Sequence, residues 1–208
     1  MIRQVILVAG GPVDLWPDRI QSPFSREETC WIGVDKGAWH LLEHNYPLDI
    51  AIGDFDSLTE EELIKIRTVA KEVYASPVEK EDTDTELALE HAVTHFPFAN
   101  YWLIGISGGR FDHTLSNFWL PLQDRFRSFA EQIRLWDQFN DIYFFTPGRY
   151  ELQRKSQYPV VSFAPLTEVK QLTLEHVKYP LTDVSVAYPR IWTSNELVEA
   201  VGFVSFTS

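Results

Sequence analysis

Residues 48–62, which read LDIAIGDFDSLTEEE, carry the pattern that decides the fold class. A short apolar run ends at Gly53, and an acidic loop follows it. Thr59 and Glu62 then have the spacing of a capping box, in which a helix begins with two side chains that each cap the other's backbone. A buried strand, a loop and a capped helix in succession are one repeating unit of an α/β sheet.

The same unit recurs on both sides of this stretch. Further apolar runs lie at residues 5–9, 30–34, 73–75 and 101–106, and a second capping box, Thr83 with Glu86, opens another helix. Continuous apolar strands that alternate with helices indicate a parallel sheet covered on both faces. We therefore predict an α/β domain over residues 1–128, an open parallel sheet with helices on both faces. Pro121 should kink or end the helix that begins near Asp112.

After about residue 130 the segments become short, aromatic and β-branched, with turn residues between them. Strands are expected at residues 160–163, 171–174, 184–186 and 203–206. Pro147 and Gly148 separate residues 142–146 from residues 150–153, which favours a hairpin there. We predict a second domain over residues 129–208, an all-β sandwich.

Composition excludes several classes of partner. The formal net charge of -12 argues against nucleic acid or an anionic membrane, because the long-range field would repel both. No apolar run approaches the roughly 20 residues that a membrane-spanning helix needs. Cys30 is the single cysteine, so an internal disulfide is impossible, and a buried thiol suits a reducing compartment. We expect a cytoplasmic protein.

Glycines and charged residues follow nearly every strand of the predicted sheet. They are Gly10, Gly11, Asp35, Asp54, Asp56, Lys80, Asp82, Asp84, Gly108, Gly109, Arg110 and Asp112. The carboxyl ends of parallel strands share one edge, so these residues should converge on one crevice. Clustered carboxylates repel one another unless a cation compensates, and Mg2+ prefers such oxygen ligands. Glycine amides, Lys80 and Arg110 would suit phosphate groups, so the set indicates phosphoryl-type transfer.

Each of these residues also has an ordinary structural interpretation. Asp54 and Asp56 suit a turn, Asp84 suits the first turn of a helix, and Asp112 suits an N-cap. His113 is more often solvent-facing than a general base. Only the combination along one sheet edge favours a catalytic site.

Three motifs in order resemble the thiamine pyrophosphokinase family in its bacterial form: residues 53–57 (GDFDS), 83–89 (TDTELAL) and 108–117 (GGRFDHTLSN). Residues 33–37 resemble the acidic loop of that family, and residues 172–174, 178–181 and 194–196 resemble its C-terminal signatures. The resemblance implies an ATP-binding α/β domain and a β-sandwich domain that binds thiamine and dimerises. It also implies a homodimer with active sites at the subunit interface.

The resemblance further implies a role for each matching residue. Asp54, Asp56 and Asp84 would hold Mg2+ and orient the ATP phosphates, and Arg110 with Asp112 would complete the catalytic set. The nucleotide would meet Gly10, Gly11, Asp35, Lys36, Gly37, Lys80, Thr83, Gly108, Gly109, His113 and Asn117. Thiamine would meet Ser194, Asn195 and Trp192 from the partner subunit. The thiamine hydroxyl would attack the β-phosphorus of ATP with AMP as leaving group, and either Asp84 or Asp112 would accept the proton.

Three other functions would use similar machinery. A pyrophosphokinase acting on a hydroxymethylpterin would share the acidic site, and Ser194 with Asn195 favours thiamine over it. A non-catalytic thiamine or nucleotide sensor would bind without turnover. A metal-dependent phosphohydrolase would release phosphate or pyrophosphate without an acceptor.

Overall fold

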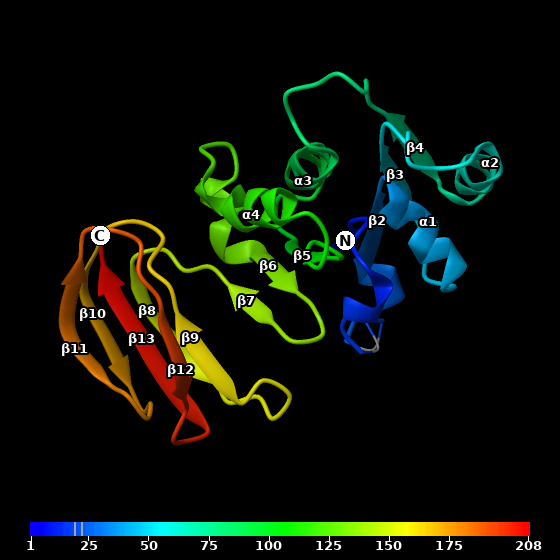
Figure 1. Ribbon diagram of the computed structural model, residues 1–208. Coiled ribbons are helices and arrows are strands. Elements are labelled where there is room, and N and C mark those ends of the chain that lie inside the picture. The colour runs from blue at the N-terminus through cyan, green and yellow to red at the C-terminus, as the bar shows by residue number, and fades with distance from the viewer. Residues whose placement is uncertain (19, 22) are drawn as a thin grey trace. The chain divides into compact units, whose positions relative to one another are not determined.

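The chain folds into two compact units, residues 1–144 and residues 145–208 (Figure 1). The computed structural model describes residues 1–18, 20–21 and 23–208. In this part of the chain, no helix is both long and apolar enough to cross a membrane.

The first unit is built on a seven-stranded sheet. Its strands are β1 (Gln4–Val8), β2 (Thr29–Val34), β3 (Ile50–Gly53), β4 (Glu72–Ala75), β5 (Asn100–Ile104), β6 (Ile133–Trp136) and β7 (Asp141–Tyr143). The spatial order is β4-β3-β2-β1-β5-β6-β7. Neighbouring strands are parallel except for β7, which pairs antiparallel with β6. The predicted α/β class is confirmed.

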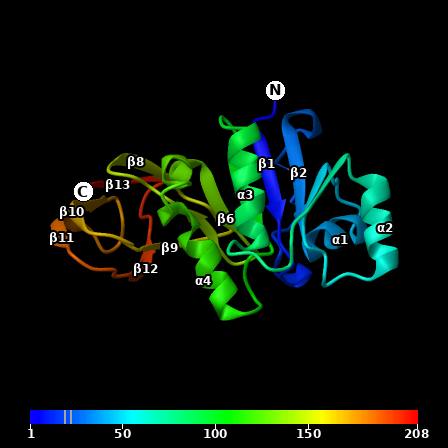
Figure 2. The ribbon, with the colours of Figure 1, turned by 90° about the horizontal axis from the view of Figure 1, so that it is seen from above.

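Helices connect the parallel strands of this sheet. They are α1 (Lys36–Glu43), α2 (Glu60–Val69), α3 (Asp84–His95) and α4 (Phe111–Trp119), with short 3₁₀ turns η1 (Val13–Leu15), η2 (Arg26–Glu28), η3 (Leu120–Leu122) and η4 (Arg127–Gln132). The chain adds β2, β3 and β4 on one side of β1, then crosses to add β5 and β6 on the other. Right-handed crossovers therefore place α1 and α2 on one face and α3 and α4 on the opposite face. Figure 2 shows α3 beside β1, which it contacts.

Local sequence signals set where these helices begin and end. The Thr59 hydroxyl accepts the amide of Glu62, whose carboxylate in turn accepts the Thr59 amide at 2.7 Å. Thr83 and Glu86 make the same pair of bonds at the start of α3. Both predicted capping boxes are confirmed. α4 ends at Trp119 and the chain tightens into η3, as the proline in that turn predicts.

A buried aspartate ties the start of β2 to the sheet. Asp49 is 5% exposed and accepts hydrogen bonds from Arg26 Nη2 at 2.6 Å and from the Trp31 amide at 3.0 Å. Lys71 Nζ lies 2.8 Å from the same carboxylate. Burial opposes the charge of Asp49, but the hydrogen bonds from Arg26 and Lys71 outweigh it and lower its pKa. The carboxylate therefore stays ionised inside the fold.

The second unit contains two antiparallel sheets. Its strands are β8 (Gly148–Gln153), β9 (Val160–Phe163), β10 (Val169–Glu175), β11 (Leu181–Val186), β12 (Trp192–Glu196) and β13 (Val201–Thr207). One sheet has the order β11-β10-β13-β8, and the other pairs β12 with β9. Apolar residues from both sheets pack on a small core: Val169, Leu172, Leu174, Val177, Leu197 and Val204. This arrangement agrees with the predicted sandwich.

The passage between the two units differs from the sequence-based expectation. The hairpin predicted around Pro147 and Gly148 is wrong, because β7 pairs with β6 whereas β8 pairs with β13. The turn residues there mark the point where the chain leaves one unit for the other. Since β6 and β7 extend the first sheet, the units divide after residue 144 and not after residue 128.

Candidate active site

Main-chain atoms pack tightly at the ends of β1 and β5, where the strand order reverses. The Gly11 amide donates to the Gly105 carbonyl at 2.8 Å, and a Cβ on Gly11 would overlap that oxygen. Gly105 has a φ of +68°, which favours glycine. Nearby, Gly37 packs so closely on Val8 that a Cβ would overlap its carbonyl oxygen. Ligands of open α/β sheets bind at such a reversal.

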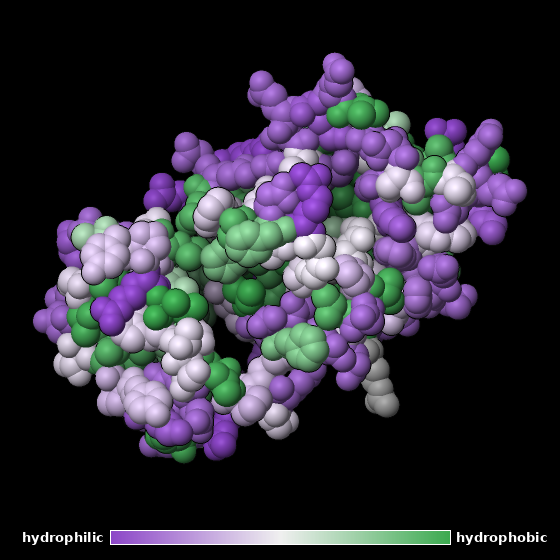
Figure 3. All heavy atoms as spheres, in the orientation of Figure 1, coloured by the Kyte–Doolittle hydropathy of each residue, from purple (hydrophilic) through white to green (hydrophobic). Residues whose placement is uncertain are grey.

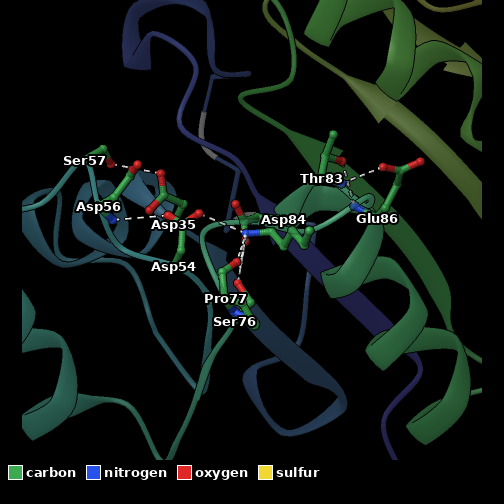
Figure 4. A network of polar contacts seen from close by, with 10 residues as sticks. Asp35, Asp54, Asp56, Ser57, Ser76, Pro77, Thr83, Asp84 and Glu86 are labelled. Atoms are coloured by element: carbon green, nitrogen blue, oxygen red, sulfur yellow. Dashed lines mark hydrogen bonds and ion pairs between the residues drawn. The ribbon is translucent and has the colours of Figure 1, made fainter.

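Three carboxylates meet where β2 and β3 end, as Figure 4 shows. Asp35 stands just before α1, and Asp54 and Asp56 lie in the loop after β3. One oxygen from each lies within 4.8 Å of the other two. The spacing fits a cation that takes hard oxygen ligands. The Asp35, Asp54 and Asp56 side chains are called the acidic cluster below.

Asp35 is the member of the acidic cluster whose surroundings most clearly call for a cation. Its Oδ2 accepts the Ser57 hydroxyl at 2.9 Å, but its Oδ1 is buried and has no hydrogen-bond partner among the described residues. Burial raises the pKa of Asp35, and the bond from Ser57 only partly offsets this. An unpartnered buried carboxylate oxygen is costly unless something binds it. The acidic cluster therefore fits a divalent cation such as Mg2+.

Lys80 places an internal cation next to the acidic cluster. Its Nζ lies 2.9 Å from Asp54 Oδ2 and 2.9 Å from Asp84 Oδ1, and it donates to Ser76 Oγ at 3.1 Å and to the Pro77 carbonyl at 3.0 Å. Burial works against the charge of Lys80, but the two carboxylates raise its pKa. Burial likewise opposes ionisation of Asp54, and the bond from Lys80 overcomes it and lowers the pKa of Asp54. Asp84 is thereby linked to the acidic cluster through one ammonium group.

The predicted residues after β5 do not join this network in the described structure. Arg110 and Asp112 form an exposed pair, with Nη2 2.6 Å from Oδ2 and the side chains 74% and 64% exposed. His113 is also exposed, and Gly108 has a φ of +83°. Asn117 is buried and donates to the Ile106 carbonyl at 3.2 Å, so it fastens the loop after β5 to α4.

The remaining nucleotide-side residues line the ends of β1, β2 and α3. Gly10 lies against Lys36, so that a Cβ there would stand 3.2 Å from the lysine Cβ. The Thr83 side chain caps the N-terminus of α3, where it accepts a hydrogen bond from the Glu86 amide. Ser57 and Ser76 were not predicted to have a role, although both donate hydrogen bonds to site carboxylates. The position of Ser76 directly after β4, at the same sheet edge, is the signal that would have found it.

The residues predicted to meet the second substrate lie in the second unit. A pocket of about 280 Å³ is lined by Leu174, Tyr179, Leu181, Ile191, Trp192, Thr193 and Asn195. Asn195 is 2% exposed, and its amide group accepts the Tyr179 N–H at 3.0 Å and donates to the Tyr179 carbonyl at 2.9 Å. It therefore shapes the pocket wall by holding Tyr179. Ser194 is exposed with a φ of 60°, and Arg190 lies over the Trp192 ring at 4.8 Å.

Comparison with known families gives two matches in chain order. The model described as "Thiamin pyrophosphokinase, catalytic domain" matches residues 23–131. The model described as "Thiamin pyrophosphokinase, vitamin B1 binding domain" matches residues 149–208. The two matched ranges fall within the two structural units.

Individual relatives agree over nearly the full length. The thiamine pyrophosphokinase of Bacillus subtilis (strain 168) is 37% identical over 207 residues, which cover 99% of this chain and 94% of the relative. The crystal structure of a thiamin pyrophosphokinase family protein from Enterococcus faecalis has a TM-score of 0.93 at 40% identity, covering 99% of this chain and 94% of that one. The thiamin pyrophosphokinase from Geobacillus thermodenitrificans has a TM-score of 0.84 at 34% identity, with coverages of 100% and 94%.

Proposed function

The chain belongs to the thiamine pyrophosphokinase family of transferases, and from that membership we propose that it transfers the pyrophosphoryl group of ATP to thiamine. The products would be thiamine diphosphate and AMP. One observation links this reaction to particular residues: Lys80 lies beside the acidic cluster. Such a site suits phosphoryl-type transfer, because catalysis there consists mainly of positioning and neutralising phosphate charge.

Mg2+ is the cation that we propose for the acidic cluster. Asp54 and Asp56 would hold it together with Asp35, whose buried Oδ1 has no partner among the described residues. Asp84, the third predicted ligand, would act beside them through its link to Lys80. When bound, Mg2+ would offset the negative charge of the ATP phosphates.

The chain's own residues would do the rest of the chemistry. Lys80 would contact a phosphate oxygen, and the amides of the glycine pairs after β1 and β5 would approach the phosphates closely. The thiamine hydroxyl oxygen bonds to the β-phosphorus, and the bond from that phosphorus to the oxygen it shares with the α-phosphorus breaks, so AMP departs with that oxygen. Asp84 is our choice to accept the hydroxyl proton, because it lies within the network while Asp112 pairs with Arg110 at the surface.

Arg110 and Asp112 keep a role in this proposal as parts of the rim. Their exposed side chains are free to turn toward phosphates that occupy the crevice, which suits a guanidinium that binds phosphate. His113 and Asn117 would support the same loop, with Asn117 fixing its backbone.

Thiamine would bind at the pocket of the second unit, where Trp192 of the lining would offer an aromatic surface. Ser194, which is exposed between two lining residues, would add a polar contact. We further propose a homodimer in which that pocket serves the partner subunit's nucleotide site. An exposed apolar face on α4 and η3 supports an interface: Phe111, Trp119 and Leu122 are 73%, 50% and 40% exposed. Figure 3 shows apolar surface in this region. A cytoplasmic location stays a prediction.

A product assay tests the proposed reaction. Purified protein with Mg2+, ATP and thiamine should form AMP and thiamine diphosphate in equal amounts, and Asp54→Asn should lower the rate by at least ~100-fold. Asp183→Asn, which removes an exposed carboxylate from β11, should leave the rate unchanged.

Three other outcomes would replace the proposal with a different function. Transfer to a hydroxymethylpterin and not to thiamine would identify the other pyrophosphokinase. Thiamine binding without AMP formation would identify a sensor. Phosphate or pyrophosphate released without an acceptor would identify a phosphohydrolase.

A further inference from the structure

Arg125 lies outside every motif that marks the site, yet its guanidinium contacts four polar side chains. Its Nη1 and Nη2 donate to the two carboxylate oxygens of Asp82, each at 2.7 Å. Its Nε donates to Gln123 Oε1 at 2.9 Å. Two carboxylates of α3 approach the same guanidinium, Glu90 at 3.4 Å and Glu86 at 3.5 Å. Paired parallel bonds of this kind fix direction as well as distance.

The Arg125 side chain also contacts residues close to it in the sequence. Its guanidinium lies 4.8 Å from the ring of Phe126, which is fully buried. Gln123, which accepts from Arg125, also donates to Glu86, the capping residue of α3. These contacts connect the stretch between η3 and η4 to the first turn of α3. The side chains of Arg125, Asp82, Gln123 and Glu86 are called the clamp below.

Asp82 belongs to the segment between β4 and α3, residues 76–83, which also carries Lys80. Three acidic residues of this segment, Glu79, Glu81 and Asp82, directly precede the acidic first turn of α3 in the sequence. Like charges in neighbouring positions push such a segment outward unless a cation joins them. The Arg125 guanidinium supplies that cation, since it binds both carboxylate oxygens of Asp82 at 2.7 Å.

We propose that Arg125 is a positioning residue: by gripping Asp82 it holds residues 76–83 so that the Lys80 ammonium points at the acidic cluster. Lys80 reaches Asp54 and Asp84, and Asp82, two residues further along the same segment, reaches Arg125. The role of Lys80 at phosphate rests on the proposed function. The geometry of the clamp does not depend on it.

Hydrogen–deuterium exchange tests the clamp without any reaction. In Arg125→Gln, amides of residues 76–83 should exchange at least several-fold faster than in the wild type, and Arg125→Lys should recover part of the protection. Arg3→Gln is the matched control, because it removes an arginine from an exposed ion pair with Glu28. Unchanged exchange in Arg125→Gln would overturn the proposal whatever the enzyme's activity.

Steady-state kinetics then distinguish positioning from a general loss of folded protein. Arg125→Gln should raise KM for ATP roughly tenfold while KM for thiamine stays within about twofold. Asp82→Asn should have the same effect, and the double variant should be no worse than either single one. An active wild type with normal KM values in Arg125→Gln would refute the positioning role alone. An inactive wild type would refute the proposed reaction, and the exchange result would still decide the clamp.

Discussion

Asp35 has a φ of 48°, a backbone conformation that few side chains adopt, at the point where β2 passes into α1. The strand ladder continues to this residue, since its amide donates to the Ile52 carbonyl at 2.8 Å. The opposite residue, Gly53, offers no side chain, and a Cβ there would stand 3.0 Å from the Asp35 backbone. The two residues together allow the Asp35 carboxylate to face Asp54. Residues held in rare conformations often mark functional sites.

A prediction at the residue scale concerns Asp49. Because the folded state lowers its pKa, its contribution to stability is present above the unfolded-state value of about 3.9 and is lost as pH falls through the lower folded value. Asp49→Asn should cost about 2 kcal/mol in the free energy of unfolding at neutral pH, because Arg26 and Lys71 lose a charged acceptor. Between about pH 5 and pH 2 the variant should lose less stability than the wild type.

Urea denaturation across this pH range measures the effect. Asp183→Asn serves as the surface control and should follow the wild-type curve. Parallel loss of stability in Asp49→Asn and the wild type would show that the buried carboxylate contributes nothing to acid sensitivity.

Sequence motifs located the acidic site at the residue scale but not all of its contacts. The motif at residues 53–57 pointed to Asp54 and Asp56, because two carboxylates follow a buried strand directly. Asp35 was expected at the same sheet edge and was assigned to the nucleotide, but its place within the acidic cluster depends on one backbone angle, which no short pattern encodes. Arg125 was missed because its partners come from α3 and the segment before it, and only the fold brings them together.

At the scale of elements, the two capping boxes form a natural pair for comparison. Thr59→Ala and Thr83→Ala should each lower the free energy of unfolding by about 1 kcal/mol, because each leaves helix amides unpaired. Only Thr83→Ala should also raise KM for ATP, since α3 begins with Asp84 and carries the network around Lys80. Denaturation and steady-state kinetics on both variants measure this. Equal KM values in the two variants would mean that the start of α3 does not position the site.

Elements with a strong local pattern were predicted well. The apolar runs of β1, β2 and β5 and the capped helices α2 and α3 appear where periodicity and capping placed them. β6 and β12 were not resolved from sequence, and β7 was expected within residues 142–146 but with the wrong partner, because short, mixed segments could pair with either neighbour. Their assignment depends on long-range pairing, which also explains the wrong hairpin at Pro147.

At the scale of the whole molecule, the exposed apolar face of α4 and η3 leads to a prediction about assembly. Light scattering at micromolar concentration should give about 48 kDa, twice the 24.1 kDa of one chain. Trp119→Glu should shift the mass toward one chain, because a charge on this face would be desolvated in an interface. Ile64→Glu, on α2, changes a residue of similar exposure and should leave the mass unchanged. A wild type with the mass of one chain would contradict the homodimer.

The closely packed glycines at the centre of the first unit limit how this chain can diverge over time. Gly11, Gly37 and Gly105 each contact a neighbouring backbone carbonyl so tightly that any side chain would collide with it. Every coding change at these codons therefore meets the same steric barrier, whatever residue it introduces. Substitutions are therefore expected to accumulate at other positions than these three glycines. The backbone around these three glycines therefore stays the same, while the residues that surround it can change.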